Sequence, residues 1–322
     1  MSLNIEMTKT ERVMSAVHGH EVDRVPVCFW HHFRPEGSGR LMAEATYAFF
    51  AEEFDLDILK VMPDLPYPFP HKSIHSPEDW RLIESINIER SRFFNQRVSA
   101  IQALRGVVGD DTPIIMTVFN PLCEALNFAQ TREDFVNQLH DNPIVIHEAL
   151  SIIAENLRAH MQECIDAGAD GIFFALQGCT TDLMSRELYR EFGRPYDLMA
   201  LQGVIDGWLN IMHVHGDDNL MFDDVLDYPV QVVSWSDRLA GPSLREARAK
   251  TSKCLMGGWH EFGPLSNGPV EKIREEAEDA LKQTGGRKFI LANGCSVPDD
   301  TDHSWLTEAR NIVDTLEMPT NE

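Results

Sequence analysis

Short apolar segments alternate along the chain with longer segments in which apolar positions recur every three or four residues. The short segments are apolar at nearly every position, which is typical of strands that are buried on both faces and therefore parallel. Parallel strands need crossover connections, and the longer periodic segments supply helices for them. The pattern predicts strands over residues 24–30, 57–62, 112–119, 170–176, 211–215, 231–236, 254–258 and 289–292.

Helix signals lie between most of these strands. Thr8 and Glu11 form a capping-box pattern that opens a helix through Val17. Gly168 ends a long helical pattern. Helices are also predicted over residues 41–54, 89–104, 132–139, 143–167, 185–206 and 305–316.

Eight βα units in 322 residues predict a (β/α)8 TIM barrel, which is an α/β fold. A doubly wound sheet is the alternative, but Gly37-Ser38-Gly39 lacks the third glycine of a dinucleotide-binding turn and does not directly follow a strand. The chain has no Walker loop, internal repeat or linker. We therefore expect one domain over residues 1–322, in which residues 1–23 form a helical extension before the first strand.

Two histidines and a distant cysteine occur at the ends of two predicted strands. His213 and His215 are two positions apart, so both point to the same side of their strand. Cys295 lies in the loop that follows the last strand. Because a barrel delivers the C-terminal ends of all its strands to one face, the three side chains can meet there. Two imidazoles and one thiolate are a ligand set for zinc with a position open for substrate, so we predict one metal ion, zinc or another divalent cation.

Other residues at the same face are candidates for catalysis. His31 and His32 follow the first predicted strand, and an imidazole can carry protons near neutral pH. The alternative for His31 and His32 is that each is simply a polar residue at the rim of the site. His260 follows the seventh strand and is a candidate fourth ligand or base. Asp57 and the loop containing Asp64 could supply a carboxylate, and the sequence does not choose between them.

Charge and composition narrow the classes of partner. The chain has 28 Lys and Arg against 51 Asp and Glu, a formal net charge of −23, so nucleic acid and anionic membranes are not expected partners. No apolar stretch approaches the roughly 18 residues of a membrane span, and the first residues do not resemble a signal peptide. Six scattered cysteines indicate reduced thiols and a cytoplasmic location.

Three segments resemble the uroporphyrinogen decarboxylase superfamily. Residues 11–19, followed by residues 23–27, are similar to its N-terminal segment, and residues 168–174 are similar to its fourth strand. Residues 291–298, with Gly294, Cys295 and Pro298, resemble the Gly-Cys-x-x-Pro end of its methyltransferase branch. The resemblance extends over nearly the whole chain and implies a single barrel.

The methyltransferase branch implies zinc bound by a His-x-Cys pair after the fifth strand and a cysteine after the eighth. His213 and Cys295 stand at matching positions, whereas His215 replaces the first cysteine. Zinc accepts imidazole as readily as thiolate, but the exchange makes the centre less negative. The resemblance thus implies methyl transfer between a corrinoid, presented by a separate corrinoid protein, and a small-molecule acceptor that need not be a thiol.

The decarboxylase branch is the main rival, since it acts on an octacarboxylate tetrapyrrole without metal or cofactor. Its Arg-rich loop after the first strand is replaced here by a segment in which Arg34 and Arg40 are the only basic groups besides the histidines. Such a segment is a poor host for many carboxylates. A non-catalytic corrinoid-binding barrel is a third alternative, and the sequence leaves a homodimer open.

Overall fold

The computed structural model describes residues 6–33, 38–68 and 74–319. Within them, eight strands form one parallel sheet in the order β1-β8-β7-β6-β5-β4-β3-β2. The strands are β1 Val27–Cys28, β2 Leu59–Val61, β3 Ile114–Phe119, β4 Gly171–Leu176, β5 Ile211–Val214, β6 Val232–Trp235, β7 Cys254–Trp259 and β8 Phe289–Asn293. The eight predicted strands are therefore present, and the α/β class is confirmed.

One edge strand of the sheet, β1, contacts the residues that lead into the other edge strand, β2. Asp57 donates its backbone N–H to the carbonyl of Val27 at 3.0 Å. In return, the Asp57 carboxylate accepts the backbone N–H of Val27 at 2.8 Å. The backbone N–H of Val27 is bonded to a side chain, and Pro26 has no backbone N–H, so neither residue donates a strand-to-strand hydrogen bond here. β1 therefore spans only two residues rather than the predicted 24–30. The sheet is thus curled, and the segment that leads into β2 lies against β1.

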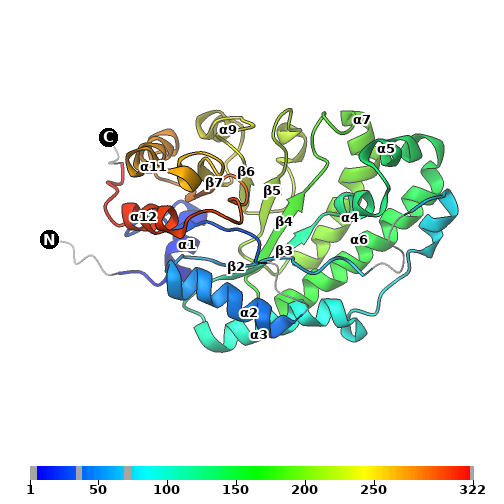
Figure 1. The fold of residues 1–322 in the computed structure, drawn as a ribbon, viewed down its shortest axis with the longest axis horizontal. Coiled ribbons are helices and arrows are strands. Elements are labelled where there is room, and N and C mark those ends of the chain that lie inside the picture. Colours follow the sequence, from blue (N-terminus) through cyan, green and yellow to red (C-terminus); the bar gives the residue numbers. More distant parts are fainter. Residues whose placement is uncertain (1–5, 34–37, 69–73, 320–322) are drawn as a thin grey trace.

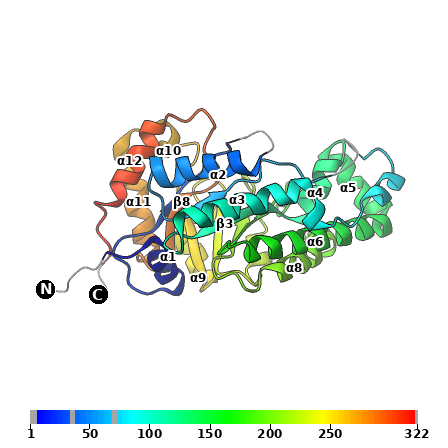
Figure 2. The same cartoon turned by 90° about the horizontal axis from the view of Figure 1, so that it is seen from below.

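Helices surround the curled sheet (Figures 1 and 2). In both views, α11 (Val270–Thr284) and α12 (His303–Val313) lie at one end of the molecule, and α5 (Arg132–Asp141) and α6 (Pro143–Asp166) lie at the other. The other α-helices are α1 Lys9–His18, α2 Gly39–Tyr47, α3 Arg92–Val108, α4 Pro121–Phe128, α7 Arg186–Leu188, α8 Arg194–Ala200, α9 Leu244–Lys250 and α10 Pro264–Asn267.

Local chemistry explains where the helices agree with the sequence and where they differ. Thr8 caps α1 with the predicted capping box, and Gly19 ends the helix at φ 83°. The predicted helix over 185–206 is present as an uninterrupted helical stretch over residues 186–204, in which the hydrogen bonding changes between α, π and 3-10. Pro195, which has no N–H, lies in the first turn of α8, directly after the π segment. Helices α4, α9, α10 and α11 lie outside the predicted ranges.

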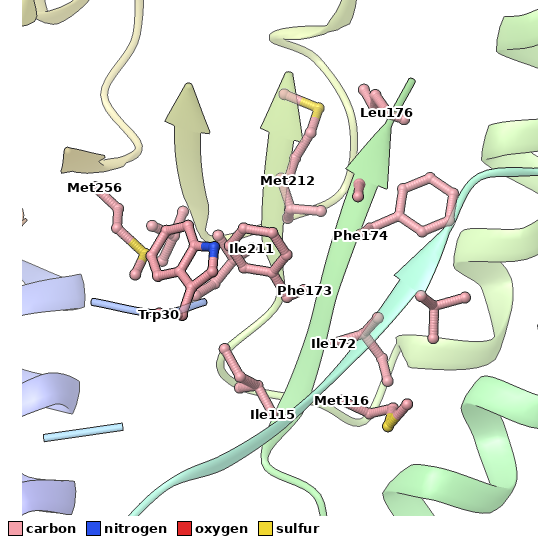
Figure 3. Close-up of a cluster of buried hydrophobic side chains, with 14 of the residues drawn as sticks. Trp30, Ile115, Met116, Ile172, Phe173, Phe174, Leu176, Ile211, Met212 and Met256 are labelled. Atoms are coloured by element: carbon pink, nitrogen blue, oxygen red, sulfur yellow. The ribbon is translucent and has the colours of Figure 1, made fainter. Parts of the chain in front are cut away.

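The interior of the curled sheet is filled by apolar side chains from opposite strands. Figure 3 shows Trp30, Phe173, Ile211 and Met256 in one cluster, and each is at most 2% exposed. The Trp30 and Phe173 rings meet edge to face with centroids 5.3 Å apart. This layer forms a floor below the C-terminal ends of the strands. No helix in the described part of the chain is both long and apolar enough to cross a membrane.

Candidate metal centre

The fifth and eighth strands hold the candidate ligands. His213 is the third residue of β5, where it pairs with Ala175 of β4 and Ser234 of β6. His215 directly follows β5, and Cys295 lies two residues after the end of β8. Strands β6 and β7 separate β5 from β8, but the curl of the sheet brings their C-terminal ends together.

The three side chains converge. One ligand atom from each of His213, His215 and Cys295 can be chosen so that all lie within 4.8 Å of one another. Cys295 Sγ lies 3.6 Å from His215 Nδ1. Bond lengths of about 2.3 Å to sulfur and about 2.0 Å to nitrogen place two tetrahedral zinc ligands about 3.5 Å apart. The observed separation therefore fits two ligands of one ion.

His213 has the surroundings of a ligand. Its Nδ1 lies 3.3 Å from Ser234 Oγ, which orients the ring. Its Nε2 is buried and has no hydrogen-bond partner among the described residues. The ring also stacks on Phe173, with centroids 5.3 Å apart. A buried ring nitrogen costs free energy when it is left unpaired, and a bound cation would satisfy it.

Electrostatics keep both imidazoles neutral. Burial holds the pKa of His213 well below its usual range, and the neighbouring His215 lowers it further. Burial also lowers the pKa of His215. Neutral imidazoles offer the lone pairs that a metal needs. For Cys295, burial and then the charge of Glu261 raise the pKa to about 11, so cation binding at this thiol would release a proton.

A small cavity of about 70 Å³ lies against the three residues. Its floor is the aromatic layer of Trp30 and Phe173, and its wall includes Lys60 and Thr117 from β2 and β3. The remaining lining residues are His32, Met62, Pro63, Phe119, Ala175, Gln177 and Ser296. The cavity can hold a few heavy atoms, and a macrocycle does not fit inside it.

The structure separates the three candidate catalytic histidines. His32 lines the cavity, and its Nδ1 lies 2.8 Å from the Asp64 carboxylate. His31 packs instead among aromatic rings that include Phe49, and its Nδ1 lies 2.9 Å from the His32 carbonyl. His260 Nδ1 accepts the backbone N–H of Phe262 at 3.1 Å. Neither His31 nor His260 is among the residues that line the cavity.

The two candidate carboxylates also differ. Asp57 is completely buried before β2, where it pairs with Arg12 at 2.7 Å and with Arg24 at 2.6 Å. It therefore has a structural role away from the cavity. Asp64 lies after β2 and positions His32.

Three polar groups near the centre were not identified from the sequence. Lys60 and Thr117 line the cavity, and Glu261 is buried beside Gly294, where a carboxylate oxygen has no partner among the described residues. Ser236 donates a hydrogen bond to the other oxygen of Glu261. The sequence does contain a signal for Lys60, because a lysine between Leu59 and Val61 is unusual in a strand that is otherwise apolar.

A sequence model of the family "Uroporphyrinogen decarboxylase (URO-D)" matches residues 50–316, which is most of the chain. The chain belongs to the uroporphyrinogen decarboxylase family. The resemblance expected from the sequence is thereby confirmed. Arg34 lies outside the described residues, and the Arg40 side chain is 79% exposed and 3.6 Å from Glu44. Within the described segments, this member of the family therefore has no buried arginine cluster after β1.

Two relatives that match the chain over most of their own length are methyltransferases. A methylcobamide:CoM methyltransferase, MtaA, from Methanosarcina barkeri strain Fusaro is 26% identical, and the match covers 91% of the chain and 93% of the relative. A uroporphyrinogen decarboxylase from Chlorobium limicola is 27% identical, but the match covers only 50% of the chain and 46% of the relative. A solved methyltransferase structure from Methanosarcina mazei has the same fold, with a TM-score of 0.80, 23% identity, and coverage of 96% of the chain and 99% of that structure. These relatives identify the chain as an enzyme.

Proposed function

We propose that this enzyme is a zinc-dependent methyltransferase that moves a methyl group between a corrinoid and a small acceptor. The observation that carries the proposal is the convergence of His213, His215 and Cys295, whose ligand atoms lie within 4.8 Å of one another. The full-length similarity to methylcobamide:CoM methyltransferases supports the reaction class.

Each residue of the centre has a distinct part in the proposal. The neutral rings of His213 and His215 and the Cys295 thiolate hold the ion, and the Ser234 hydroxyl fixes the His213 ring. When bound, zinc favours the deprotonated, nucleophilic form of a thiol or hydroxyl of the acceptor. The aromatic floor excludes water from this side of the site. His32, held through Nδ1 by Asp64, is suited to take the proton of the acceptor at Nε2.

The corrinoid is proposed to come from a partner protein. A cavity of about 70 Å³ cannot enclose a corrinoid ring, so the ring must approach from outside. We also infer that the sheet closes as a (β/α)8 barrel forming one domain over residues 1–322. The contact between Val27 and Asp57 and the structural likeness to the Methanosarcina mazei methyltransferase support this inference. The six free cysteines fit a reducing compartment such as the cytoplasm.

Metal analysis of the purified protein tests the proposal. We expect about one zinc per chain in the natural protein and a large loss of zinc in Cys295→Ala. Cys179→Ala is a matched control, because Cys179 is buried and lies outside the cluster. Methyl transfer from methylcobalamin to a thiol should depend on zinc. The change in the visible spectrum of the corrinoid measures the transfer.

The rival functions predict other results. Turnover by the metal-free natural protein would refute the metal-dependent mechanism. Release of CO₂ from uroporphyrinogen that a chelator does not inhibit would favour the decarboxylase. Tight binding of a corrinoid protein without turnover, unchanged in His213→Ala, would favour a non-catalytic barrel.

A further inference from the structure

An open depression of about 520 Å³ lies at the end of the curled sheet that faces away from the candidate metal centre. It is formed where α9 ends and where β7 and β8 begin, whereas the candidate ligands lie at the C-terminal ends of β5 and β8. Helix α9 packs beside β7 (Figure 1). The residues that line this basic depression are Arg248, Ala249, Lys250, Thr251, Ser252 and Lys288. Three of these side chains are cationic, and none of the described lining residues is acidic.

Two of the three cations are bonded to neutral partners. Arg248 donates from Nη1 to the Lys253 carbonyl at 2.8 Å and from Nη2 to the Lys288 carbonyl at 2.7 Å. Lys288 donates from Nζ to the Ser252 carbonyl at 2.9 Å. Among the residues that the structure describes, neither Arg248 nor Lys288 forms a salt bridge with a carboxylate. Both positive charges therefore lack a compensating anion, and burial accordingly lowers the pKa of Arg248.

The third cation and two hydroxyl groups also line the basic depression. Lys250 Nζ lies 2.8 Å from the Asp223 carboxylate, but the two side chains are 41% and 62% exposed, so this ion pair is weak and can open. The Thr251 hydroxyl accepts the backbone N–H of Lys253 at 3.2 Å and keeps its own proton to donate. Ser252 is exposed and adds a second hydroxyl. Guanidinium, ammonium and hydroxyl donors around one depression are the groups that bind phosphate in proteins.

The Lys288 side chain is held in place by packing. A Cβ built on Gly19 would lie 3.0 Å from Lys288 Cγ and 3.1 Å from Lys288 Cε, so the stem of the lysine passes close to this glycine. The main chain at Lys288 has φ 46°, in the left-handed region that few residues with a side chain adopt. The ammonium is thus held at the depression before any ligand arrives, and an anion does not have to order it.

The local charge at the basic depression is opposite to that of the whole chain. Residues 244–253 contain four basic side chains and one acidic side chain, whereas the chain has 28 basic and 51 acidic residues. The one acidic side chain, Glu246, is bonded to Ser243 at the start of α9. The C-terminal end of α9 offsets at most about half a unit charge. An anion that most of the surface repels is therefore attracted here.

We propose that the basic depression binds a phosphate group, of free phosphate or of a small phosphate ester, at Arg248, Lys250 and Lys288. A dianion is the ligand that matches three cations and two hydroxyl donors. The site is independent of the proposed function, because none of the described residues that line the depression lines the cavity at the metal centre. Bound phosphate joins the end of α9 to the start of β8, so it should stabilise the folded chain.

Calorimetry of the metal-free protein at constant ionic strength tests the site, because phosphate then has no zinc to bind. We expect inorganic phosphate to bind with a dissociation constant of about 1 mM or below, and acetate to bind at least about 10-fold more weakly. Ribose 5-phosphate identifies the source of the phosphate group. Tighter binding of this ester than of phosphate assigns the site to an ester, and equal or weaker binding assigns it to free phosphate. Phosphate that binds no more tightly than acetate would overturn the proposal.

Three variants locate the binding. Lys288→Gln should weaken phosphate binding by about 10- to 100-fold, the range for a hydrogen bond to a charged group. Lys250→Gln should weaken it by about 2- to 5-fold, because this side chain is exposed. Lys272→Gln is the matched control, since Lys272 is exposed on α11, pairs with Glu275 and lies outside the depression, and its affinity for phosphate should equal that of the natural protein. Unchanged affinity in Lys288→Gln would overturn the proposal.

Chemical labelling of the natural protein tests the site without any variant. With phosphate at about ten times its dissociation constant, acetylation by acetic anhydride should slow about 10-fold at Lys250 and Lys288 and stay unchanged at Lys272. Mass spectrometry measures the labelling of each lysine. Equal labelling with and without phosphate would overturn the proposal even if Lys288→Gln does not fold. Because none of these measurements uses zinc, the phosphate site and the proposed function can fail separately.

Discussion

Cys295 Sγ lies 3.6 Å from His215 Nδ1, although the two residues are 80 positions apart in the chain. Their strands are not neighbours in the sheet, so the contact depends on its curl and not on local sequence. Both side chains are held from loops that directly follow strands. We therefore expect the site to keep its shape when one candidate ligand is exchanged for another of similar reach.

The first prediction exchanges His215 for the cysteine that the methyltransferase branch has at this position. His215→Cys should still bind about one zinc, because zinc accepts thiolate and imidazole alike. One added negative charge at the centre should raise the pKa of a bound acceptor thiol, and the acidic limb of the pH–rate profile should move upward by about 1 unit. Stopped-flow methyl transfer to 2-mercaptoethanol between pH 5 and pH 9 measures the limb.

His260→Ala is the control for this exchange, because His260 lies outside the cavity lining. The acidic limb of the pH–rate profile of His260→Ala should match that of the natural protein. A limb that stays in place or moves downward in His215→Cys would contradict the electrostatic reason. Loss of zinc from this variant would instead contradict the ligand assignment.

The second prediction concerns the hydroxyl that orients His213. Ser234 Oγ lies 3.3 Å from His213 Nδ1, and outer groups of this kind fix the ring of a ligand. Ser234→Ala should weaken zinc binding by about 10- to 100-fold, measured by competition with a chromophoric chelator. Ser234→Thr keeps a hydroxyl group and should lose much less zinc affinity than Ser234→Ala. Equal zinc affinities in all three proteins would show that the serine does not act on the ring.

The sequence was informative about the candidate ligands for a physical reason. Residues i and i+2 of a strand share a side, and parallel strands present their C-terminal ends together, so the strand pattern alone groups His213, His215 and Cys295. The same reasoning could not choose between His260 and Glu261. Both follow β7, and the path of the loop turns Glu261 inward while the His260 ring packs beside Gly263.

Lys60 and Asp57 show the second limit of the sequence. Lys60 lies in an apolar strand, where the pattern does not reveal whether a polar residue faces the cavity or the helices. Asp57 precedes the same strand, and its arginine partners come from α1 and from the segment before β1. Pairings between distant segments follow from the three-dimensional arrangement, which strand and helix periodicity alone do not contain.

The third prediction concerns acid stability. Asp23 is half-buried and binds Arg12 through two hydrogen bonds, and these bonds, with those from the Met7 and Arg24 N–H groups, lower its pKa to about 2 against the opposing effect of burial. A carboxyl whose pKa is lowered on folding adds stability above its unfolded value, near 4, and loses it as the pH falls through about 2. Asp23→Asn should therefore cost about 2 kcal/mol in the free energy of unfolding at pH 7.

Urea unfolding at several pH values measures this difference. The gap between the natural protein and Asp23→Asn should narrow as the pH falls from 5 toward 2, because the natural carboxyl then takes up its proton. The exposed Asp206 provides the control, and Asp206→Asn should stay within about 0.5 kcal/mol of the natural protein. A gap that is constant over this range would show that the loss comes from packing and not from the charge.

The last prediction tests how the sheet is held where β1 meets β2. The Asp57 carboxylate is completely buried, accepts the Val27 N–H, and pairs with Arg12 and Arg24. Removing this carboxylate takes away the buried partner of both arginines, so Asp57→Ala should lower the free energy of unfolding by about 3–5 kcal/mol. Asp57→Asn keeps an oxygen that can accept the Val27 N–H but removes the charge. Its free energy of unfolding should therefore fall by less than that of Asp57→Ala.

Hydrogen exchange at the Val27 amide separates the two contributions. Its protection should fall sharply in Asp57→Ala and be largely kept in Asp57→Asn, because the amide oxygen can still accept the bond. If Val27 remains protected in both variants, the backbone bond from Asp57 to Val27 holds the junction without the side chain. In that case the arginines stabilise α1 against the sheet, and the junction of β1 with β2 does not depend on them.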